Sequence, residues 1–229
     1  MRWAKPHVDV GLIVRQLEPM LAFWQGPAGL AFEERLPTGR GNHQHRHAMN
    51  GSVLKLNASR DPLPESPPSG YRELWIARER ADARDLIDPD GNHLRLVPRG
   101  DRGVVGIAMC VGVRDPDRHA AFYRDAFGLE EDGPGTFVCG DSRLFVEADP
   151  EAPSDASIRG AGYRYLTLQV HDCDAETDHA LAHGARLGAP PRTHGDVARF
   201  SMLRDPDGNW IEISQRRSLT GPLPREENA

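Results

Sequence analysis

One five-residue motif occurs twice in this chain and constrains its fold more than any other feature. The sequence Asp-Pro-Asp-Gly-Asn occupies residues 88–92 and occurs again at residues 205–209. A short apolar run follows each copy, at residues 93–97 and 210–214. Proline fixes φ and glycine accepts positive φ, so the motif predicts a tight turn that enters a strand. The chain is therefore predicted to contain two related units.

Two further pairs of segments support a duplication, and they occur in the same order in both units. Residues 7–14 resemble residues 106–113, and residues 70–74 resemble residues 162–166. The stretch between residues 70–74 and the turn motif is much shorter in the first unit than its counterpart in the second. We therefore expect the first unit to have lost about one helix and one strand from its second half.

The pattern along the chain predicts an α+β fold of tandem βαβββ modules that form two cup-shaped domains. The domains are expected at residues 1–100, with a truncated second module, and at residues 101–217, followed by a polar tail at residues 218–229. Periodicity predicts helices at residues 17–25, 117–127 and 174–184. Strands are expected at residues 7–14, 30–36, 43–48, 52–57, 71–77, 92–97, 105–113, 135–139, 143–148, 163–170, 196–203 and 209–214.

The composition is that of an ordinary soluble protein and argues against several functions. Its formal net charge of -6 argues against a nucleic-acid partner, because phosphate binding needs clustered Lys and Arg. No apolar run approaches the roughly 20 residues that span a bilayer, so no membrane partner is expected. The first residues lack the apolar stretch of a signal peptide, and the three cysteines form no CxxC pair. A cytoplasmic location is expected.

The segment Asp117–Leu129, with the pattern Asp-x4-Phe-Tyr-x4-Gly-Leu, and the motif Asp-Pro-Asp-Gly-Asn-x-x-Glu resemble the vicinal oxygen chelate superfamily. This superfamily includes glyoxalase I, fosfomycin-resistance enzymes, bleomycin-binding proteins and extradiol dioxygenases. The resemblance covers roughly residues 5–216 and is strongest in residues 104–216. It implies paired βαβββ modules that curve into a cup around one divalent metal. The ligands come from the first strand of one module and the first and last strands of its partner, and some members add one from the fourth strand.

The resemblance assigns ligand positions in this chain, but neither unit has a complete set. The first-strand positions are His7 and Gly106, the fourth-strand positions Lys55 and Phe145 or Glu147, the fifth-strand positions Glu73 and Tyr165, and the last-strand positions Arg95 and Glu212. Two arrangements remain open. A metal could lie within the first unit, bound by His7, Glu73 and a histidine from a nearby strand. Alternatively, the modules could be exchanged between units, which would bring His7 together with Glu212 and Tyr165.

Three histidines, His43, His45 and His47, alternate along one predicted strand. Alternate strand residues share a face, so these side chains could point together into the cup. His45, the middle one, completes the predicted metal ligands His7, His45, Glu73 and Glu212. Imidazole and carboxylate suit several divalent metals, of which Fe(II) or Mn(II) is favoured over Zn, Ni or Co. The alternative is a solvated strand edge with three exposed histidines.

Cationic side chains stand at two of these positions and point to substrate binding instead. Arg95 has no lone pair to give a metal, so it is expected to bind an anionic substrate group or to pair with Glu73 or Glu147. Lys55 and Tyr165 are predicted as further substrate-binding residues. Glu73 has an alternative role of neutralising Lys55 or Arg95 without any metal.

The resemblance implies a metal-dependent enzyme that acts on a small molecule. A dioxygenase- or lyase-like reaction on a small aromatic or heterocyclic oxygen-bearing substrate is the first expectation. The alternative is a metal-free binding protein that sequesters a drug or metabolite. A structural or regulatory dimer is a third reading, and a homodimer is left open.

Overall fold

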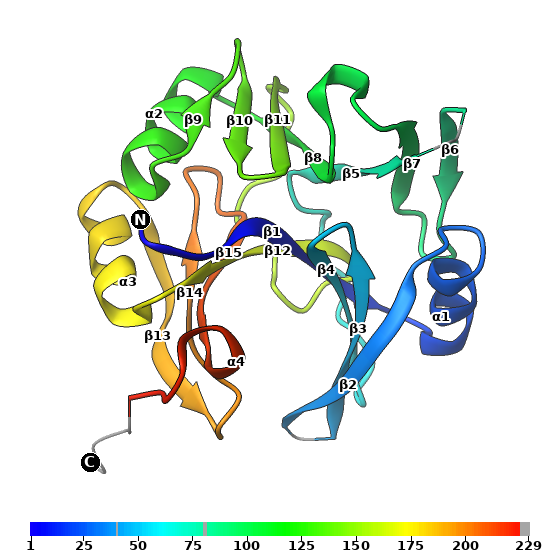
Figure 1. The fold of residues 1–229 in the computed structure, drawn as a ribbon, viewed down its shortest axis with the longest axis horizontal. Coiled ribbons are helices and arrows are strands. Elements are labelled where there is room, and N and C mark those ends of the chain that lie inside the picture. Colours follow the sequence, from blue (N-terminus) through cyan, green and yellow to red (C-terminus); the bar gives the residue numbers. More distant parts are fainter. Residues whose placement is uncertain (40, 80–81, 225–229) are drawn as a thin grey trace.

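Most strands of the chain belong to two curved mixed sheets in the computed structural model, which describes residues 1–39, 41–79 and 82–224 (Figure 1). The eight strands of sheet A are, in spatial order, β13 (Arg186–His194), β14 (Ala198–Arg204), β15 (Trp210–Arg216), β12 (Gly162–Val170), β1 (Trp3–Val14), β4 (Ser52–Ala58), β3 (Asn42–Met49) and β2 (Ala31–Gly39). The seven strands of sheet B are β6 (Arg84–Ile87), β7 (His93–Pro98), β5 (Tyr71–Arg78), β8 (Ile107–Val113), β11 (Ser142–Ala148), β10 (Thr136–Cys139) and β9 (Glu130–Glu131). The predicted α+β fold class is confirmed.

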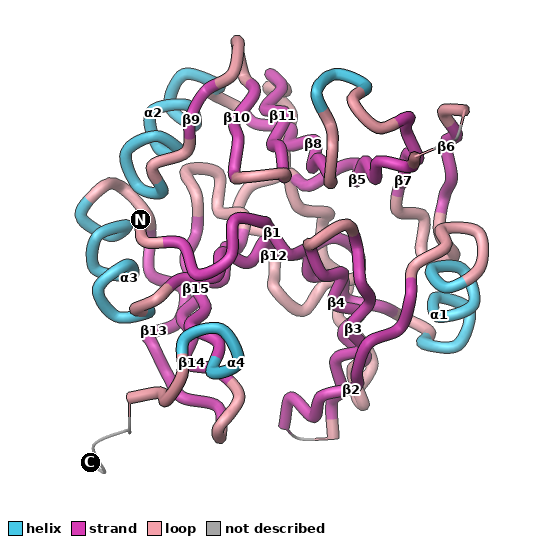
Figure 2. The backbone as a smooth tube through the Cα atoms, viewed as in Figure 1, coloured by secondary structure: helices cyan, strands magenta, loops and turns pink. Residues whose placement is uncertain are grey.

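Helices α1 (Leu17–Gln25), α2 (Pro116–Phe127) and α3 (Cys173–Ala182) lie at the outer sides of the two sheets, whereas α4 (Arg217–Thr220) is seen beside β14, between the two arms of sheet A (Figure 2). A short 3-10 turn lies at Asp101–Gly103. Asp115 caps α2 by accepting a hydrogen bond from the Arg118 amide at 3.0 Å, and Gly128 ends it with φ 64°. None of the described helices has the length and hydrophobicity needed to span a bilayer.

The modules pair across the two repeats. Sheet A joins the first module (β1–β4 with α1) to the last module (β12–β15 with α3), through antiparallel pairing of β1 with β12. Sheet B joins the two middle modules through antiparallel pairing of β5 with β8. Of the two arrangements left open by the sequence, the structure has the exchanged one. The predicted boundary between residues 100 and 101 separates the repeats but not the sheets, since each repeat contributes strands to both.

The truncation of the first repeat is confirmed. The last module contains β12, α3, β13, β14 and β15, whereas β6 is the one element between β5 and β7 among the described residues. One helix and one strand are therefore missing. Strands β6, β9 (Glu130–Glu131) and β13 were not predicted from the sequence, and all three are edge strands. β13 contains Pro190 and Pro191, and proline is tolerated at a sheet edge because it cannot donate to a ladder.

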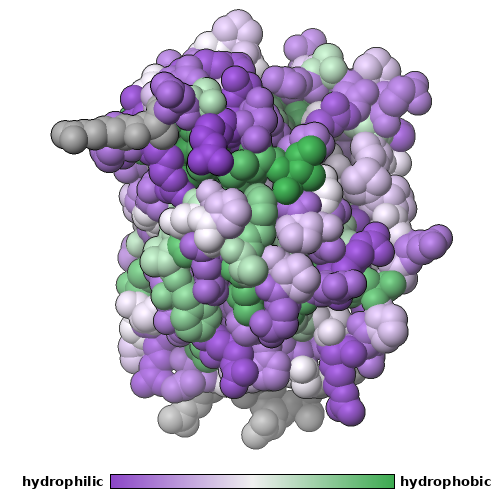
Figure 3. Space-filling view, turned by 90° about the vertical axis from the view of Figure 1, so that its right-hand side faces the viewer, coloured by the Kyte–Doolittle hydropathy of each residue, from purple (hydrophilic) through white to green (hydrophobic). Residues whose placement is uncertain are grey.

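The two sheets share one apolar core. Val8, Val10 and Leu12 of β1 are buried in the same cluster as Leu74 and Ile76 of β5. Successive strand residues point to opposite faces, so the odd-numbered residues of β1 face the hollow side of sheet A. On the outer surface in Figure 3 polar side chains predominate, with apolar ones among them. The exposed large apolar side chains among the described residues are Phe32, Ile87, Leu187 and Leu219.

A buried histidine connects α2 to the second turn motif. The His119 side chain is fully buried, and its Nε2 atom lies 3.6 Å from Asp205 Oδ2 and 3.8 Å from Asp207 Oδ2. Burial alone lowers the pKa of His119, but the nearby Asp205 carboxylate outweighs that effect and the net pKa is raised. A positive charge on His119 therefore stabilises the contact between the third and fourth modules.

Candidate functional site

The hollow face of sheet A encloses a cavity of about 520 Å³. Its walls come from the first and last modules, so residues from the two ends of the chain meet in it. We call this cavity cup A. β1 and β12 form its floor, because they are the central strands of the sheet. The exchanged pairing of modules therefore creates a site that neither repeat could form alone.

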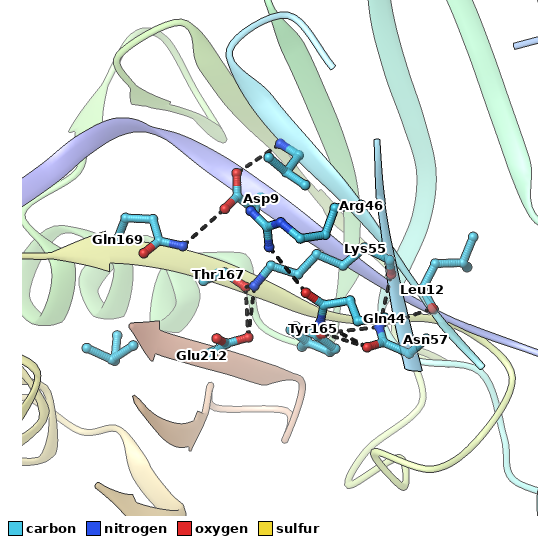
Figure 4. Close-up of polar contacts among 12 residues, drawn as sticks. Asp9, Leu12, Gln44, Arg46, Lys55, Asn57, Tyr165, Thr167, Gln169 and Glu212 are labelled. Carbon is cyan, nitrogen blue, oxygen red and sulfur yellow. Dashed lines mark hydrogen bonds and ion pairs between the residues drawn. The ribbon is translucent and has the colours of Figure 1, made fainter. Parts of the chain in front are cut away.

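A buried ammonium group lies at the floor of cup A (Figure 4). Lys55 Nζ donates hydrogen bonds to Thr167 Oγ1 at 2.6 Å and to Glu212 Oε2 at 3.0 Å. The Thr167 hydroxyl donates in turn to Glu212 Oε2 at 3.1 Å. The strand register explains the cluster, because Thr167 of β12 is paired with Glu212 of β15. The lysine side chain is only 3% exposed, so it depends on these acceptors.

Asp9 forms the second anionic group of the floor and is completely buried. It accepts hydrogen bonds from Lys5 Nζ at 2.7 Å, the Val53 amide at 2.9 Å and Gln169 Nε2 at 3.2 Å. Burial alone would raise the pKa of Asp9, but the charges of Lys5 and Lys55 outweigh it and the pKa is lowered. Asp9 is therefore an ionised carboxylate beneath the cavity.

Lys55 lies in the field of both carboxylates. Burial lowers the pKa of Lys55, and the charges of Glu212 and Asp9 oppose that shift. An ammonium has three donors and no lone pair. Two of these donors have acceptors among the described residues, and Lys55 lines the cavity, so the third can serve a ligand oxygen.

Tyr165 crosses the floor of the cup, and a glycine makes this crossing possible. A Cβ atom on Gly11 would overlap the Tyr165 ring. The phenol accepts hydrogen bonds from Asn57 Nδ2 at 3.1 Å and Gln44 Nε2 at 3.3 Å. Burial raises the pKa of Tyr165, so the phenol stays neutral. Lys55 Nζ lies 5.4 Å from the ring centroid, close enough for a cation–π contact.

Positive charge and apolar surface dominate the rest of cup A. The lining contains one acidic side chain among the described residues, that of Glu212. The cationic lining residues are Arg46, Lys55, Arg159, Arg192 and Arg216. The apolar and aromatic lining residues include Leu36, Leu63, Ile158, Phe200, Met202 and Trp210. Cup A thus suits an anion with an apolar body.

The hollow face of sheet B is filled by the protein itself. Trp75, Phe145 and Val104 belong to a separate buried apolar cluster there. The Arg102 guanidinium lies 5.3 Å from the Trp75 ring centroid and 4.4 Å from that of Phe145. The segment that links the two repeats therefore covers the hollow of sheet B, and cup A is the better candidate site.

The predicted ligand His7 lies away from the floor of cup A. It contacts the β3–β4 turn, where a Cβ on Gly51 would meet its ring. The pairing of β1 with β12 is irregular between Trp3 and Val8, and His7 falls within that stretch. Burial is the main cause of its lowered pKa. His7 and Glu212 share sheet A, as the exchanged arrangement requires, but Lys55 is the group that Glu212 binds.

The three alternating histidines share one face of β3, as predicted, but this face is not the cup. His45 and His47 lie beside the Phe32 ring, at centroid distances of 6.3 Å and 5.6 Å. His47 Nε2 is 3.1 Å from Gln25 Nε2 at the end of α1. The residues of β3 that line the cup are Asn42, Gln44 and Arg46.

Glu73 and Arg95 lie in sheet B, apart from the other predicted site residues. Glu73 Oε2 accepts a hydrogen bond from Trp75 Nε1 at 2.6 Å. Arg95 stacks over Trp75 at 4.9 Å and pairs with Asp85 at 3.5 Å, so the expected pairing with Glu73 or Glu147 is not observed.

The predicted metal set of His7, His45, Glu73 and Glu212 is therefore not brought together. Within the described ranges, no three His, Cys, Asp or Glu side chains are placed to hold a metal ion. The floor of cup A does not fit a divalent cation either, because an ammonium donor lies between its carboxylates. Of the predicted substrate-binding residues, Lys55 and Tyr165 line cup A and Arg95 does not.

Several residues of the floor and walls of cup A were not predicted as site residues from the sequence, chiefly Asp9, Thr167, Arg46 and Arg216. Asp9 and Thr167 are paired in the sheet, each two positions beyond a residue that the resemblance had selected. The available signal was an aspartate inside the apolar run at residues 8–14, since a buried carboxylate needs a partner.

Comparisons with known proteins agree with this fold. Residues 105–213 match the family described as the Glyoxalase/Bleomycin resistance protein/Dioxygenase superfamily. A protein named "Putative glyoxylase CFP32" from Mycobacterium bovis is 22% identical, over 83% of this chain and 87% of its own length. Glyoxalase I from Zea mays has a similar structure, with a TM-score of 0.73, 14% identity and coverage of 93% of this chain and 92% of its own.

A structure described as a "putative dioxygenase" from Bacillus subtilis has a TM-score of 0.66 and 14% identity, over 94% of this chain and 86% of its own. At these identities the structural likeness establishes the fold. Together with the family match over the second repeat, it confirms the resemblance inferred from the sequence motifs.

Proposed function

Since residues 105–213 match the glyoxalase/bleomycin resistance/dioxygenase superfamily and the whole chain has the vicinal oxygen chelate fold, we propose that cup A binds a small organic anion without a divalent metal. This is the metal-free alternative among the functions expected from the sequence. The observation that carries it is the Lys55 ammonium, hydrogen-bonded to Thr167 and Glu212 at the floor of the cup.

The chemistry of the floor supports the proposal that Lys55, and not a bound metal ion, supplies the positive charge there. A divalent metal needs several lone pairs directed at one point, and the ammonium of Lys55 offers none. Lys55 already neutralises Glu212 and lies close to Asp9. One of its N–H groups remains for a ligand oxygen, so Lys55 can polarise or hold that oxygen in the way a positive ion would.

The walls define the class of ligand. Four arginines line the cup in addition to Lys55, so its lining carries more positive than negative charge. Apolar and aromatic side chains, among them Leu36, Phe200 and Trp210, also line the cup. A volume of about 520 Å³ is within the range of roughly 300–1,000 Å³ typical of small-molecule sites. An aromatic or otherwise apolar carboxylate fits these features.

The test is a titration of the protein with small aromatic carboxylates in buffer that contains EDTA. Lys55→Gln should bind them roughly 10- to 100-fold more weakly, because a hydrogen bond to a charged group contributes about 1.5–3 kcal/mol. Arg124→Gln makes the same change of charge on α2, where Arg124 pairs with Glu131, and should bind normally. Equal affinity in wild type and Lys55→Gln would exclude this role for Lys55.

A second candidate function is a divalent-metal-dependent enzyme, dioxygenase- or lyase-like, that acts on a small aromatic or heterocyclic oxygen-bearing substrate. Two carboxylates in the floor, Asp9 and Glu212, favour it, as does the fold shared with proteins described as glyoxalase I and a dioxygenase. It requires Lys55 to move away from Glu212. Elemental analysis of protein purified without a metal-affinity tag tests it, and a stoichiometric metal that Glu212→Gln loses would favour this candidate.

A further inference from the structure

A carboxylate of the protein itself binds two arginines that line cup A. Arg216 Nη2 donates to Glu34 Oε1 at 2.6 Å, and Arg46 Nε lies 3.0 Å from the same oxygen. Arg46 comes from the first module and Arg216 from the last, and both line the cavity. Glu34 therefore joins the two halves of the cup.

The burial of the three partners is unequal. The side chains of Arg46 and Arg216 are 6% and 17% exposed, whereas that of Glu34 is 41% exposed. Glu34 also lies on β2, an edge strand of sheet A. The two cations are thus fixed inside the cavity, and the anion approaches them from the solvent side. A largely buried guanidinium keeps its charge, so it needs a counter-anion whether Glu34 or another group provides it.

The two edge strands of sheet A, β2 and β13, also contact each other. His194 Nε2 of β13 is 3.1 Å from the Pro37 carbonyl oxygen of β2. β2 and β13 are the first and last strands in the spatial order of the sheet. The pair formed by Glu34 of β2 and Arg216 of β15 is a further polar contact between β2 and the last module.

We propose that Arg46 and Arg216 form a carboxylate-binding subsite and that Glu34 occupies it until a ligand carboxylate takes its place. This proposal rests on the proposed function and specifies the ligand of the same cup as a carboxylate. One carboxylate replaces another, so both guanidiniums keep a counter-anion throughout the exchange. Burial lowers the pKa of Arg216 and the charge of Arg46 adds to that effect, while the carboxylates of Glu34, Asp9 and Glu212 oppose it.

The ligand's two ends then have separate partners. The carboxylate would bind Arg46 and Arg216, and the apolar body would lie against the aromatic wall that includes Phe200 and Trp210. A further oxygen on that body can reach the N–H of Lys55 at the floor. Glu34 is a positioning residue in this scheme, because it acts only through the two arginines.

The experiment compares 2-naphthoate with its neutral analogue 2-naphthamide by calorimetric titration in EDTA. Glu34→Gln removes the internal competitor, so naphthoate should bind several-fold more tightly than to wild type, with naphthamide unchanged. Arg216→Gln should weaken naphthoate at least tenfold and leave naphthamide unchanged. Glu33→Gln, an exposed neighbour on the same strand, is the matched control and should behave as wild type.

The outcomes separate the two proposals. If wild type binds naphthoate and neither Glu34→Gln nor Arg216→Gln alters its affinity, the subsite is excluded and the function of cup A stands. If wild type binds neither compound, the proposed function fails for aromatic carboxylates, and the subsite fails with it. Thermal unfolding of each variant in the absence of ligand checks that all of them are folded.

Discussion

The Nζ atom of Lys55 lies 3.0 Å from Glu212 Oε2, and this ion pair joins the first module of the chain to the last. Lys55 is on β4 and Glu212 on β15, separated in sheet A by β1 and β12. Both side chains point to the hollow face, where Thr167 bridges them. The site therefore depends on the exchanged pairing of modules, and a single repeat has no means of forming it.

Loss of the partner of Lys55 should destabilise the fold. In Glu212→Gln the buried ammonium keeps a hydrogen-bond acceptor but loses the nearer of its two counter-charges, so we expect a decrease of about 1–3 kcal/mol in the free energy of unfolding. Urea denaturation measures this change. Glu131→Gln, which removes an exposed partner of Arg124, should cost less than about 1 kcal/mol. Equal stability of the two variants would show that the Lys55 pair is not important for the fold.

A carboxylate in place of the ammonium should change what the floor binds. Lys55→Glu places a third carboxylate beside Asp9 and Glu212, and carboxylate oxygens bind divalent metals such as Mn(II). We expect one Mn(II) per chain in Lys55→Glu and a rise in its thermal unfolding temperature on metal addition. Lys55→Gln loses the same positive charge without gaining a ligand, and should show neither effect. A folded Lys55→Glu protein without metal affinity would contradict this geometry of the floor.

The order and type of most elements could be predicted from sequence because they depend on local chemistry. The two Asp-Pro-Asp-Gly-Asn turns, the cap at Asp115 and the stop at Gly128 all act within a few residues. The pairing of modules could not be predicted in the same way. Pairing of β1 with β5 or with β12 satisfies the same alternation of apolar residues, so packing between distant segments decides between them.

The candidate site was partly predictable for a similar reason. Lys55, Tyr165 and Glu212 follow from their positions in regular strands, and all three line cup A. His7 was misplaced because the irregular stretch of β1 lies between Trp3 and Val8. The histidines of β3 share a face, but polar residues occupy both faces of that strand, and the sequence does not reveal which face is inward.

A methyl group at Gly11 should damage the cup. Gly11→Ala places a Cβ where the Tyr165 ring lies, so the ring must move and its hydrogen bonds with Asn57 must break. Overpacking of this kind costs roughly 1–3 kcal/mol. We expect lower stability and weaker ligand binding. The double variant Gly11→Ala with Tyr165→Leu should recover part of the lost stability, and absence of any recovery would mean that the ring is not the obstacle.

The buried His119 should make stability depend on pH. Its pKa is raised in the folded protein, so its stabilising effect is fully present below the ordinary value of 6.5 and is lost as the pH rises through the raised pKa. The groups that face its Nε2 atom are Asp205 and Asp207, while its Nδ1 atom lies 2.9 Å from the Asp115 carbonyl oxygen.

The measurement for His119 is denaturant unfolding of wild type and His119→Gln between about pH 6 and pH 9. The difference in unfolding free energy between them should be largest at the acidic end and should shrink as the pH rises. A difference that is constant across this range would mean that His119 is neutral throughout.

If Lys55 supplies the positive charge at the floor of cup A, binding of a ligand there needs no divalent metal. Wild-type protein without a metal-affinity tag is dialysed against EDTA, analysed for metal content, and titrated with 2-naphthoate before and after addition of Fe(II) or Mn(II). We expect the same affinity in all samples, with no stoichiometric metal required, and a much lower affinity in Lys55→Gln. Binding that appears only with one equivalent of metal, and that Glu212→Gln abolishes, would contradict it.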